Sequence, residues 1–180
     1  RQMCIRDRGV ACLEEALALR QANIQKPILI LGYTAPRYAE ILAKEQITQA
    51  MISPEYAAAL ADAARAAGVR VSAHVAVDTG MSRIGYLVNE ETFLEAVDKI
   101  AELYRNPAFH VTGIFTHFSS AYEQTQDAKD YTALQFQRFT RVCAALKQKG
   151  IEPGLRHCSN SPATVNCPEY ALDMCRAGTV

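Results

Sequence analysis

Short apolar runs alternate with helix-forming stretches along most of the chain. Seven runs have the length and composition of strands: residues 9–12, 27–31, 47–52, 69–77, 109–117, 154–158 and 171–175. Helical patterns lie between them, at 13–22, 36–43, 54–67, 89–104 and 127–149, and Ser161-Pro162 begins a further short helix. This regular alternation predicts parallel βαβ units.

Two architectures satisfy this alternation. A doubly wound open sheet usually carries a glycine-rich first turn, and no G-x-G-x-x-G motif occurs in the chain. A barrel of βα units instead collects polar residues where its strands end, and each of the last four expected strands ends in polar residues. We therefore expect an α/β fold, a TIM-type (β/α)8 barrel, that is incomplete by at least one strand.

The first eight residues differ from the rest of the chain. They read R-Q-M-C-I-R-D-R, follow no periodicity and are dense in arginine. We interpret residues 1–8 as a non-native or disordered leader. Residues 9–180 are expected to form one partial barrel domain, because no linker or low-complexity segment interrupts them.

The composition is that of an ordinary globular protein, with 49% hydrophobic and 21% charged residues. Nineteen basic and nineteen acidic residues give no net charge, which argues against a nucleic-acid or anionic-lipid partner. No apolar run approaches the roughly 20 residues that span a bilayer, and no signal peptide is recognisable. We expect a cytoplasmic protein without a membrane partner.

The six cysteines predict neither a metal site nor a disulfide framework. They include no C-x-x-C pair and no histidine at zinc-finger spacing. We interpret them as reduced, mostly buried thiols. A catalytic Cys158 beside His157 is disfavoured, because adjacent residues of a strand point to opposite faces.

Polar residues gather where the expected strands end. In chain order they are Asp78, Thr79 and Arg83, then Thr116 and His117, then Ser159, Asn160 and Ser161, then Arg176, Gly178 and Thr179. In a barrel all of these ends lie on the C-terminal rim, where the loops after the last strands often bind phosphate. The pattern therefore favours a phosphate-bearing ligand.

Each of these residues also has a purely structural interpretation. His117 could be a buried core histidine, Asn160 and Ser161 could only cap the helix that follows, and Arg176 could be an ion-pair partner. Their joint occurrence on one rim favours a ligand site. His74 and His110 lie inside strands and away from the rim, so we expect core packing for both.

Four segments carry the most distinctive sequences. They read V-D-T-G-M-S-R-I-G at 77–85, G-I-F-T-H-F-S-S-A at 113–121, R-H-C-S-N-S-P-A at 156–163 and D-M-C-R-A-G at 173–178. Together they resemble alanine racemase, the pyridoxal-phosphate enzyme family of bacterial cell-wall synthesis. Residues 9–20 and 27–34 resemble the second and third barrel strands of that family, so the resemblance runs from Gly9 to the end of the chain.

The resemblance implies a fold and an activity. The family has an N-terminal (β/α)8 barrel followed by a β-rich domain, and it acts as a homodimer whose sites share residues between subunits. This chain would supply strands two to eight of the barrel, as an internal fragment without the first strand and the C-terminal β domain. The implied cofactor is pyridoxal 5'-phosphate, and the implied reaction interconverts L-alanine and D-alanine for peptidoglycan synthesis.

The resemblance also assigns roles to rim residues. Arg176 would hydrogen-bond the pyridine nitrogen of the cofactor, with His117 as its hydrogen-bonding neighbour. Arg83 would meet the substrate carboxylate and the phenolic oxygen of the cofactor. These three residues are the implied catalytic residues.

The cofactor phosphate would lie at the other end of the same site. Ser161 and the backbone at Gly178 and Thr179 would hold it, and Asn160 would line the site. With His117 and Arg176, these are the implied cofactor-binding residues. No metal ion is implied.

This sequence departs from the family in two ways. Many members carry a carbamate-modified lysine that orients the arginine matching Arg83, and Ala76 occupies that position here. We expect Arg83 to be held by another group or by an anion. The family's Schiff-base lysine and its second base, a tyrosine, lie in segments that this sequence does not contain. Racemisation requires a base on each face of the reacting carbon, so we expect the fragment alone to be inactive, and poorly soluble because of its unpaired sheet edges.

Two other functions remain open. One is racemisation of serine or another small amino acid, because segments outside this sequence shape part of the pocket. The other is a non-catalytic pyridoxal-phosphate-binding barrel protein, and the D-T-G-M turn at 78–81 argues against it.

Overall fold

The computed structural model describes residues 8–178 of the 180-residue chain. The expected leader, residues 1–8, lies outside the described residues except for its last member, Arg8. Arg8 is the first residue of strand β1 and pairs with Ile28. The first strand therefore begins one residue earlier than we expected.

Strands and helices alternate along the described chain. The elements are β1 (Arg8–Val10), α1 (Leu13–Gln21), β2 (Ile28–Ile30), η1 (Pro36–Tyr38), α2 (Ala39–Lys44), β3 (Ile47–Met51), α3 (Pro54–Ala66), β4 (Val71–Asp78), β5 (Tyr86–Leu87), α4 (Phe93–Arg105), β6 (Phe109–Phe115), α5 (Gln126–Gln148), β7 (Leu155–His157), α6 (Ser161–Asn166) and η2 (Pro168–Tyr170). The parallel sheet runs in the order β1-β2-β3-β4-β6-β7, and β5 pairs with the end of β4.

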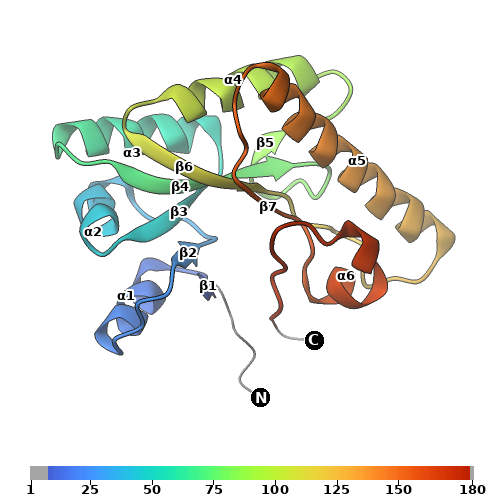
Figure 1. Cartoon of the computed structure of the whole chain (residues 1–180), viewed down its shortest axis with the longest axis horizontal. Coiled ribbons are helices and arrows are strands. Elements are labelled where there is room, and N and C mark those ends of the chain that lie inside the picture. Colours follow the sequence, from blue (N-terminus) through green and yellow to red (C-terminus); the bar gives the residue numbers. More distant parts are fainter. Residues whose placement is uncertain (1–7, 179–180) are drawn as a thin grey trace.

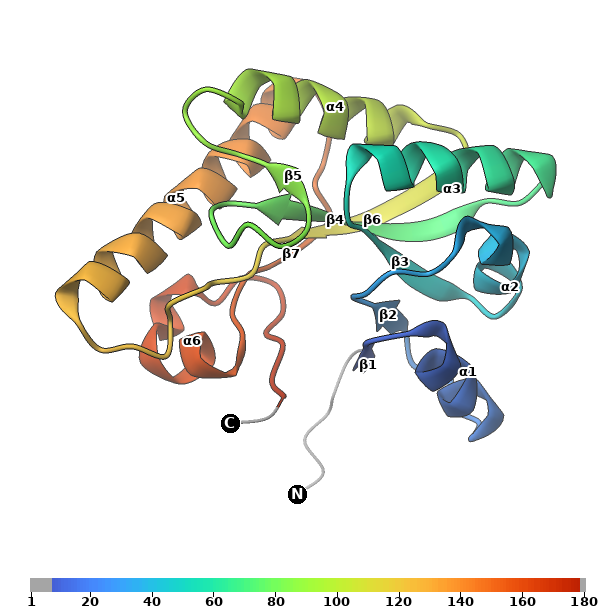
Figure 2. The ribbon, with the colours of Figure 1, turned by 180° about the vertical axis from the view of Figure 1, so that it is seen from behind.

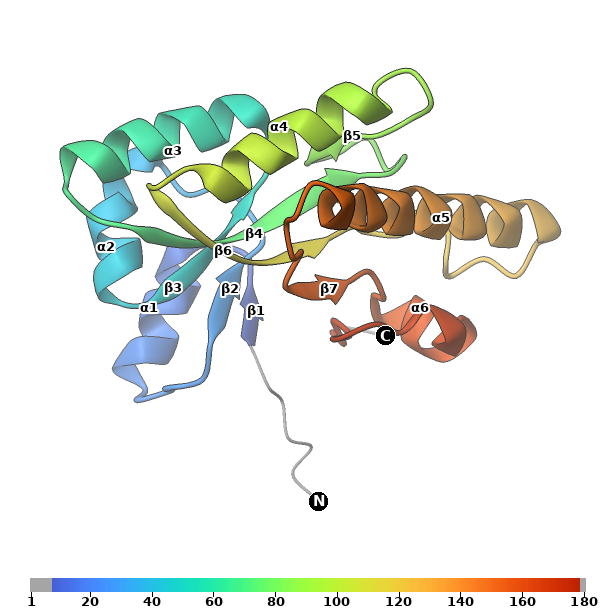
Figure 3. The ribbon, with the colours of Figure 1, turned by 45° about the horizontal axis from the view of Figure 1, so that its top comes forward.

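The sheet is curled into part of a barrel (Figure 1). Helices α1 to α5 cover its convex face, and its concave face is open (Figure 3). Because β4, β6 and β7 are parallel neighbours, their carboxyl ends meet at one rim. The expected incomplete α/β barrel is confirmed by this arrangement.

The main core lies between the sheet and the helices. Its largest fully buried side chains come from both layers and from one loop: Ile28, Ile30, Ile47, Met51, Phe109 and Ile114 from strands, Leu42, Leu60, Ile100, Phe139 and Leu146 from helices, and Phe118 from the loop after β6. Residues with the opposite side-chain direction form a second, smaller cluster of Ala50, Ala76 and Phe115. Small side chains at two of these three positions leave room on the concave face.

The prediction of a last strand over residues 171–175 was wrong. This segment is irregular after η2, and its end contributes a single parallel bridge between Arg176 and Asn160. A regular ladder is prevented because the N–H of Arg156 donates to the carboxylate of Asp173 (2.8 Å) instead of to a backbone carbonyl. The segment nevertheless lies beside β7, which places Arg176 at the rim.

Two details between β4 and α4 were not expected. The short strand β5 follows Gly85, whose N–H donates to the carbonyl of Ile52 (2.7 Å). Helix α4 begins at Phe93 and not at Asn89, because Oδ1 of Asn89 accepts from the N–H of Glu91 and of Thr92 and closes a turn there.

Three further expectations concern single residues and the membrane. The cysteines of the described part are free thiols, but only Cys143 and Cys158 are buried. His110 is exposed, so its expected core packing was wrong, whereas His74 is buried. Within residues 8–178, none of the helices has the length and apolar character needed to cross a membrane.

Candidate active site

A cavity of about 560 Å³ lies on the concave face at the carboxyl ends of the strands. Its lining includes Arg83, His117 and Arg176 from three successive rim segments, together with Leu31 and Phe115 of the inner cluster. The structure thus brings the three predicted catalytic residues to one cavity. The parallel order of β4, β6 and β7 is the reason, because each segment leaves the sheet at the same edge.

The guanidinium of Arg176 is fixed by four hydrogen bonds. Nη1 donates to Nδ1 (2.8 Å) and to the carbonyl oxygen (3.1 Å) of His157, and Nη2 donates to the carbonyls of Thr116 (2.8 Å) and Cys158 (3.3 Å). An arginine has five N–H donors. Within residues 8–178, the Nε–H is the one donor of this group without an acceptor, and it remains for a ligand in the cavity.

These contacts set the protonation of two buried histidines. Arginine donates only, so Nδ1 of His157 must accept and its proton must lie on Nε2. That Nε2–H donates to Nδ1 of His74 (2.9 Å), which leaves the proton of His74 on Nε2. Burial, then the charge of Arg176, lowers the pKa of His157 to about 2, and burial lowers the pKa of His74 to about 4. Both rings are therefore neutral near pH 7.

Arg176 itself stays positively charged. Burial lowers its pKa to about 10, which is still well above neutral pH. The ring of Phe115 lies below the guanidinium, with 5.3 Å between the guanidinium carbon and the ring centroid. His157 stacks on the same ring at a centroid distance of 5.0 Å. Arg176 can therefore offer a rigid, charged N–H donor to a ligand.

His117 binds Asn160 and not Arg176. The amide of Asn160 has a fixed orientation, because its Oδ1 accepts from the N–H of Ala163 and its Nδ2 donates to the carbonyl of Phe118. The same Nδ2 lies 3.3 Å from Nε2 of His117 and donates to it, so the proton of neutral His117 lies on Nδ1. The expected hydrogen bond from His117 to Arg176 was wrong, and His157 takes that place.

The environment of His117 keeps its ring neutral. Burial lowers its pKa to about 4, and the positive charges of Arg176 and Arg83 act in the same direction. Both arginines are thus close enough to His117 to lower its pKa through their charges, although neither is its hydrogen-bond partner.

The predicted phosphate end lies at the start of α6. Asn160 is the N-cap of this helix and Ser161 is its first residue. The hydroxyl of Ser161 accepts from the N–H of Gly178 (2.8 Å), so its own proton is free to be donated to an anion. Thr179, the remaining predicted residue, lies outside the described residues.

Arg83 is carried by a tight loop between β4 and β5. Oδ1 of Asp78 accepts from the N–H groups of Gly80 and Ser82, both at 3.0 Å. Gly80 and Gly85 have φ values of 134° and 115°, which favour glycine. The side chain of Arg83 itself is exposed, and a small cavity of about 10 Å³ separates it from buried Ala76.

Sequence reasoning missed the pairing of His157 with Arg176 and the contact between His157 and His74. One signal was available. Gly113 lies in the middle of β6, and a Cβ there would meet the ring of His74 at 2.7 Å. A glycine inside a strand often marks such a close approach. The register of β4 and β6 also shifts beside His74, so that Thr112 is an extra residue.

Comparisons with known proteins agree on one family. The model of the family described as "Alanine racemase, N-terminal domain" matches residues 2–180. The alanine racemase of Desulfovibrio desulfuricans is 47% identical over 174 residues, which cover 96% of this chain and 44% of that protein. The match includes residues 2–8 of the expected leader.

Solved structures give the same result. An alanine racemase from Clostridium difficile 630 has a TM-score of 0.85 at 37% identity, and the match covers 97% of this chain and 43% of that one. A histidine racemase from Leuconostoc mesenteroides has a TM-score of 0.79 at 31% identity, covering 94% and 43%. The chain therefore spans less than half the length of the proteins it matches.

Proposed function

The chain belongs to the alanine racemase N-terminal domain family, and from this premise we propose that it forms the barrel part of a longer, pyridoxal-phosphate-dependent racemase that interconverts L-alanine and D-alanine. The observation that carries the proposal is the hydrogen bonding of the Arg176 guanidinium. Four of its N–H groups are bound by the protein, and the Nε–H is left beside a cavity of about 560 Å³.

The residues of this cavity, together with Asn160 and Ser161 at the start of α6, fit pyridoxal 5'-phosphate. A charged N–H donor at Arg176 suits the pyridine nitrogen, and the free hydroxyl proton of Ser161 suits a phosphate oxygen. Asn160 and His117 would line the space between them. When bound, the cofactor supplies an electron sink that stabilises the negative charge left after removal of the α-proton of an amino acid.

Arg83 is the proposed contact for the substrate carboxylate. Its guanidinium lines the same cavity as Arg176, is exposed and can approach a ligand. A bidentate pair between arginine and carboxylate fixes orientation as well as charge. Arg83 is proposed to be held by another group or by an anion, and the small cavity beside Ala76, of about 10 Å³, has room for about one water molecule.

The bases for proton transfer are proposed to come from outside this chain. No lysine and no tyrosine is among the residues lining the cavity, within the part of the chain that the structure describes. The lysines present lie on helices or in loops: Lys26, Lys44, Lys99, Lys129, Lys147 and Lys149. We therefore infer that the 180 residues alone are inactive. We further propose, on the family resemblance alone, that the longer protein is a cytoplasmic homodimer that serves peptidoglycan synthesis.

The experiment is an assay of the longer polypeptide, called the full-length protein below. We expect visible absorbance from the bound cofactor and conversion of L-alanine to D-alanine. The chain of 180 residues, assayed in parallel, should convert neither enantiomer. Failure of the full-length protein to racemise alanine at saturating cofactor would contradict the proposal.

A second candidate substrate follows from the histidine racemase among the structural neighbours. The barrel is shared by racemases of different amino acids, so this chain is compatible with serine, histidine or another amino acid. Assaying the full-length protein against these substrates would separate the candidates. A kcat/KM for alanine that exceeds the others by about tenfold or more, equal to about 1.4 kcal/mol, would favour the first proposal.

A further inference from the structure

Helix α5 lies beside the loop that carries Arg83 (Figure 2). Along one face it presents Tyr131, Gln135, Arg138 and Arg141, at intervals that return to the same side of a helix. The hydroxyl of Tyr131 donates to the carbonyl of Gly80 (2.7 Å). Tyr131 therefore binds the backbone of the loop three residues before Arg83.

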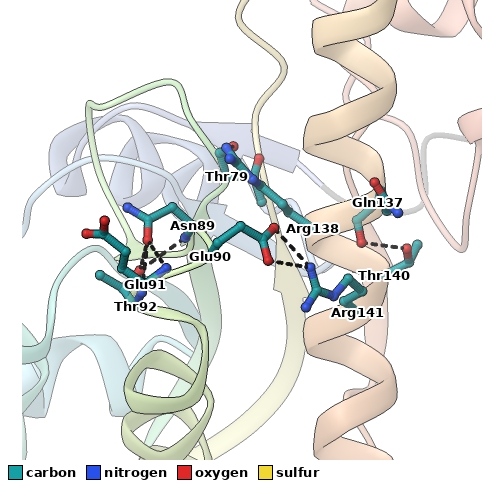
Figure 4. A network of polar contacts seen from close by, with 9 residues as sticks. All are labelled: Thr79, Asn89, Glu90, Glu91, Thr92, Gln137, Arg138, Thr140 and Arg141. Carbon is teal, nitrogen blue, oxygen red and sulfur yellow. Dashed lines mark hydrogen bonds and ion pairs between the residues drawn. The ribbon is translucent and has the colours of Figure 1, made fainter.

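Two arginines continue the same row of contacts. Nη1 of Arg138 donates to the carbonyl of Thr79 (3.1 Å), and Nη1 of Arg141 meets both carboxylate oxygens of Glu90 at 3.0 and 3.1 Å (Figure 4). The contact of Arg141 is exposed, whereas Thr79 is fully buried. The side chains of α5 thus contact the segment between β4 and α4 near both of its ends, at Thr79 and at Glu90.

Gln135 is the member of the row that reaches both catalytic loops. Its Nε2 donates to the hydroxyl of Thr79 and to the carbonyl of His117, both at 3.3 Å. Its Oε1 accepts from the N–H (3.0 Å) and the hydroxyl (3.2 Å) of Ser119. Because a carbonyl can only accept and a backbone N–H can only donate, the orientation of this amide is fixed. Gln135 is fully buried, with 0% exposure.

The two loops are also in direct contact at this point. The hydroxyls of Thr79 and Thr116 lie 2.8 Å apart. Thr79 precedes Arg83 in one loop, and Thr116 and Ser119 flank His117 in the other. A single amide therefore fixes the relative position of the segments that deliver Arg83 and His117 to the cavity.

We propose that Gln135 is a positioning residue for the racemase reaction, and that it sets the separation of Arg83 and His117 by hydrogen-bonding the loops that carry them. The proposal rests on the function proposed above. Helix α5 lies on the convex side of the sheet. Through Gln135 it would fix the positions of Arg83 and His117, which line the cavity on the concave side. Loss of the amide should loosen both loops together and leave Arg176 in place, because three of its four hydrogen bonds are to His157 and Cys158, which do not contact Gln135.

The test compares Gln135→Met with Gln137→Met in the full-length protein. Methionine keeps the length of the side chain and removes both donor and acceptor. Gln137 lies on the same helix and is exposed, so it controls for the chemical change itself. We expect Gln135→Met to raise the KM for alanine about tenfold, with a smaller fall in kcat, because substrate orientation depends on Arg83. Gln137→Met should leave both constants unchanged.

Hydrogen–deuterium exchange without substrate provides a readout that does not depend on activity. The N–H groups of Gly80, Ser82 and Ser119 should exchange about tenfold faster in Gln135→Met, the change expected for one lost buried hydrogen bond. Amides of β7 and α6, which do not contact Gln135, should exchange at their original rates. Faster exchange everywhere would reveal a general loss of stability and would overturn the proposal.

A milder variant keeps the test decisive if Gln135→Met does not fold. Ser119→Ala removes one of the four partners and should raise the KM about threefold, with faster exchange confined to the same two loops. Faster exchange of these loops with an unchanged KM would overturn the positioning role and leave the proposed function intact. Absence of racemisation by the unsubstituted protein would instead overturn the proposed function.

Discussion

Arg176 and Arg83 lie on the same rim and line the same cavity, but they are held in opposite ways. The side chain of Arg176 makes four hydrogen bonds to the protein, and burial lowers its pKa to about 10. The side chain of Arg83 is exposed, and it is the loop around it that is fixed, through Asp78, Gly80 and Gly85. One group is positioned directly and the other only through its backbone.

The difference explains which ligand contact each arginine suits. A donor fixed by four bonds loses little conformational entropy on binding, so it can meet a single ligand atom with fixed geometry. An exposed guanidinium, such as that of Arg83, can take the orientation that the carboxylate of an entering substrate requires. We expect substitutions of Arg176 to affect both folding and activity, and substitutions of Arg83 to affect substrate binding alone.

The largest expected effect is that of Arg176→Met. It leaves Nδ1 of His157 and the carbonyls of Thr116 and Cys158 without their donor, which should lower the free energy of unfolding by about 3 kcal/mol. Urea denaturation of the full-length protein measures this change, and cofactor absorbance should fall with it. Arg156→Met is the matched control, because its pair with Asp173 is partly exposed and should contribute less than about 1 kcal/mol. Equal losses in both variants would contradict the comparison.

The next effect concerns pH and tests the histidines that support Arg176. The pKa values of His74 and His157 in the folded protein, about 4 and about 2, lie below the ordinary value of 6.5. As the pH falls below 6.5 the unfolded chain takes up protons first, so stability decreases with decreasing pH. We expect these two histidines to cause a loss of about 2 kcal/mol between pH 6.5 and 5.5, and His117, whose pKa burial lowers to about 4, to add about 1 kcal/mol.

Urea denaturation at the two pH values measures this loss. His157→Phe should make the pH dependence shallower by removing one of the three buried histidines whose pKa values are lowered. His110→Asn should leave it unchanged, because His110 is exposed. A pH dependence that is the same in all three proteins would mean that the buried histidines do not cause it.

A smaller effect is expected for Arg83→Gln. Loss of a charged hydrogen bond to the substrate carboxylate should raise the KM for alanine by about tenfold or more. The free energy of unfolding should change by less than about 0.5 kcal/mol, because the side chain is exposed. Steady-state kinetics and urea denaturation together give both values, with exposed Arg65→Gln as the control. If Arg83→Gln lost as much stability as Arg176→Met, the conclusion that only Arg176 is held by the protein through its side chain would be contradicted.

No gain in activity is expected for Ala76→Lys, which introduces the lysine that the family resemblance implies at this position. Ala76 is fully buried, and the cavity of about 10 Å³ beside it cannot contain a lysine side chain, so the substitution overpacks the site. The kcat/KM should therefore not rise above the original value. A gain of more than about tenfold would indicate that Arg83 is poorly held in the natural protein.

Much of this contrast could not be read from the sequence, although the fold could. Alternating apolar and helical patterns identified the barrel class, and the positions of Arg83, His117 and Arg176 at strand ends placed all three in one cavity. The prediction of a final strand was wrong because the N–H of Arg156 donates to the side chain of Asp173 and not to a backbone carbonyl. Such a replacement leaves no trace in the hydrophobic pattern.

The partner of Arg176 was missed for a geometric reason. His117 and His157 both follow or end a strand near the rim, and sequence position does not say which ring faces the guanidinium. That choice depends on the bulge at Thr112, which shifts β6 against β4 by one residue. A pattern of apolar and polar residues does not determine such a shift.

Gly113 has a consequence for reading natural variants of this chain. It has no contact with the ligand cavity and sits in a strand where alanine or valine would look harmless. A methyl group there would enter the space of the His74 ring and displace it from His157. The Nε2–H of His157 would then lose its acceptor, and the ring that accepts from Nη1 of Arg176 would no longer be fixed from behind. A substitution scored as conservative would thus act on Arg176 through the neighbouring strand β7.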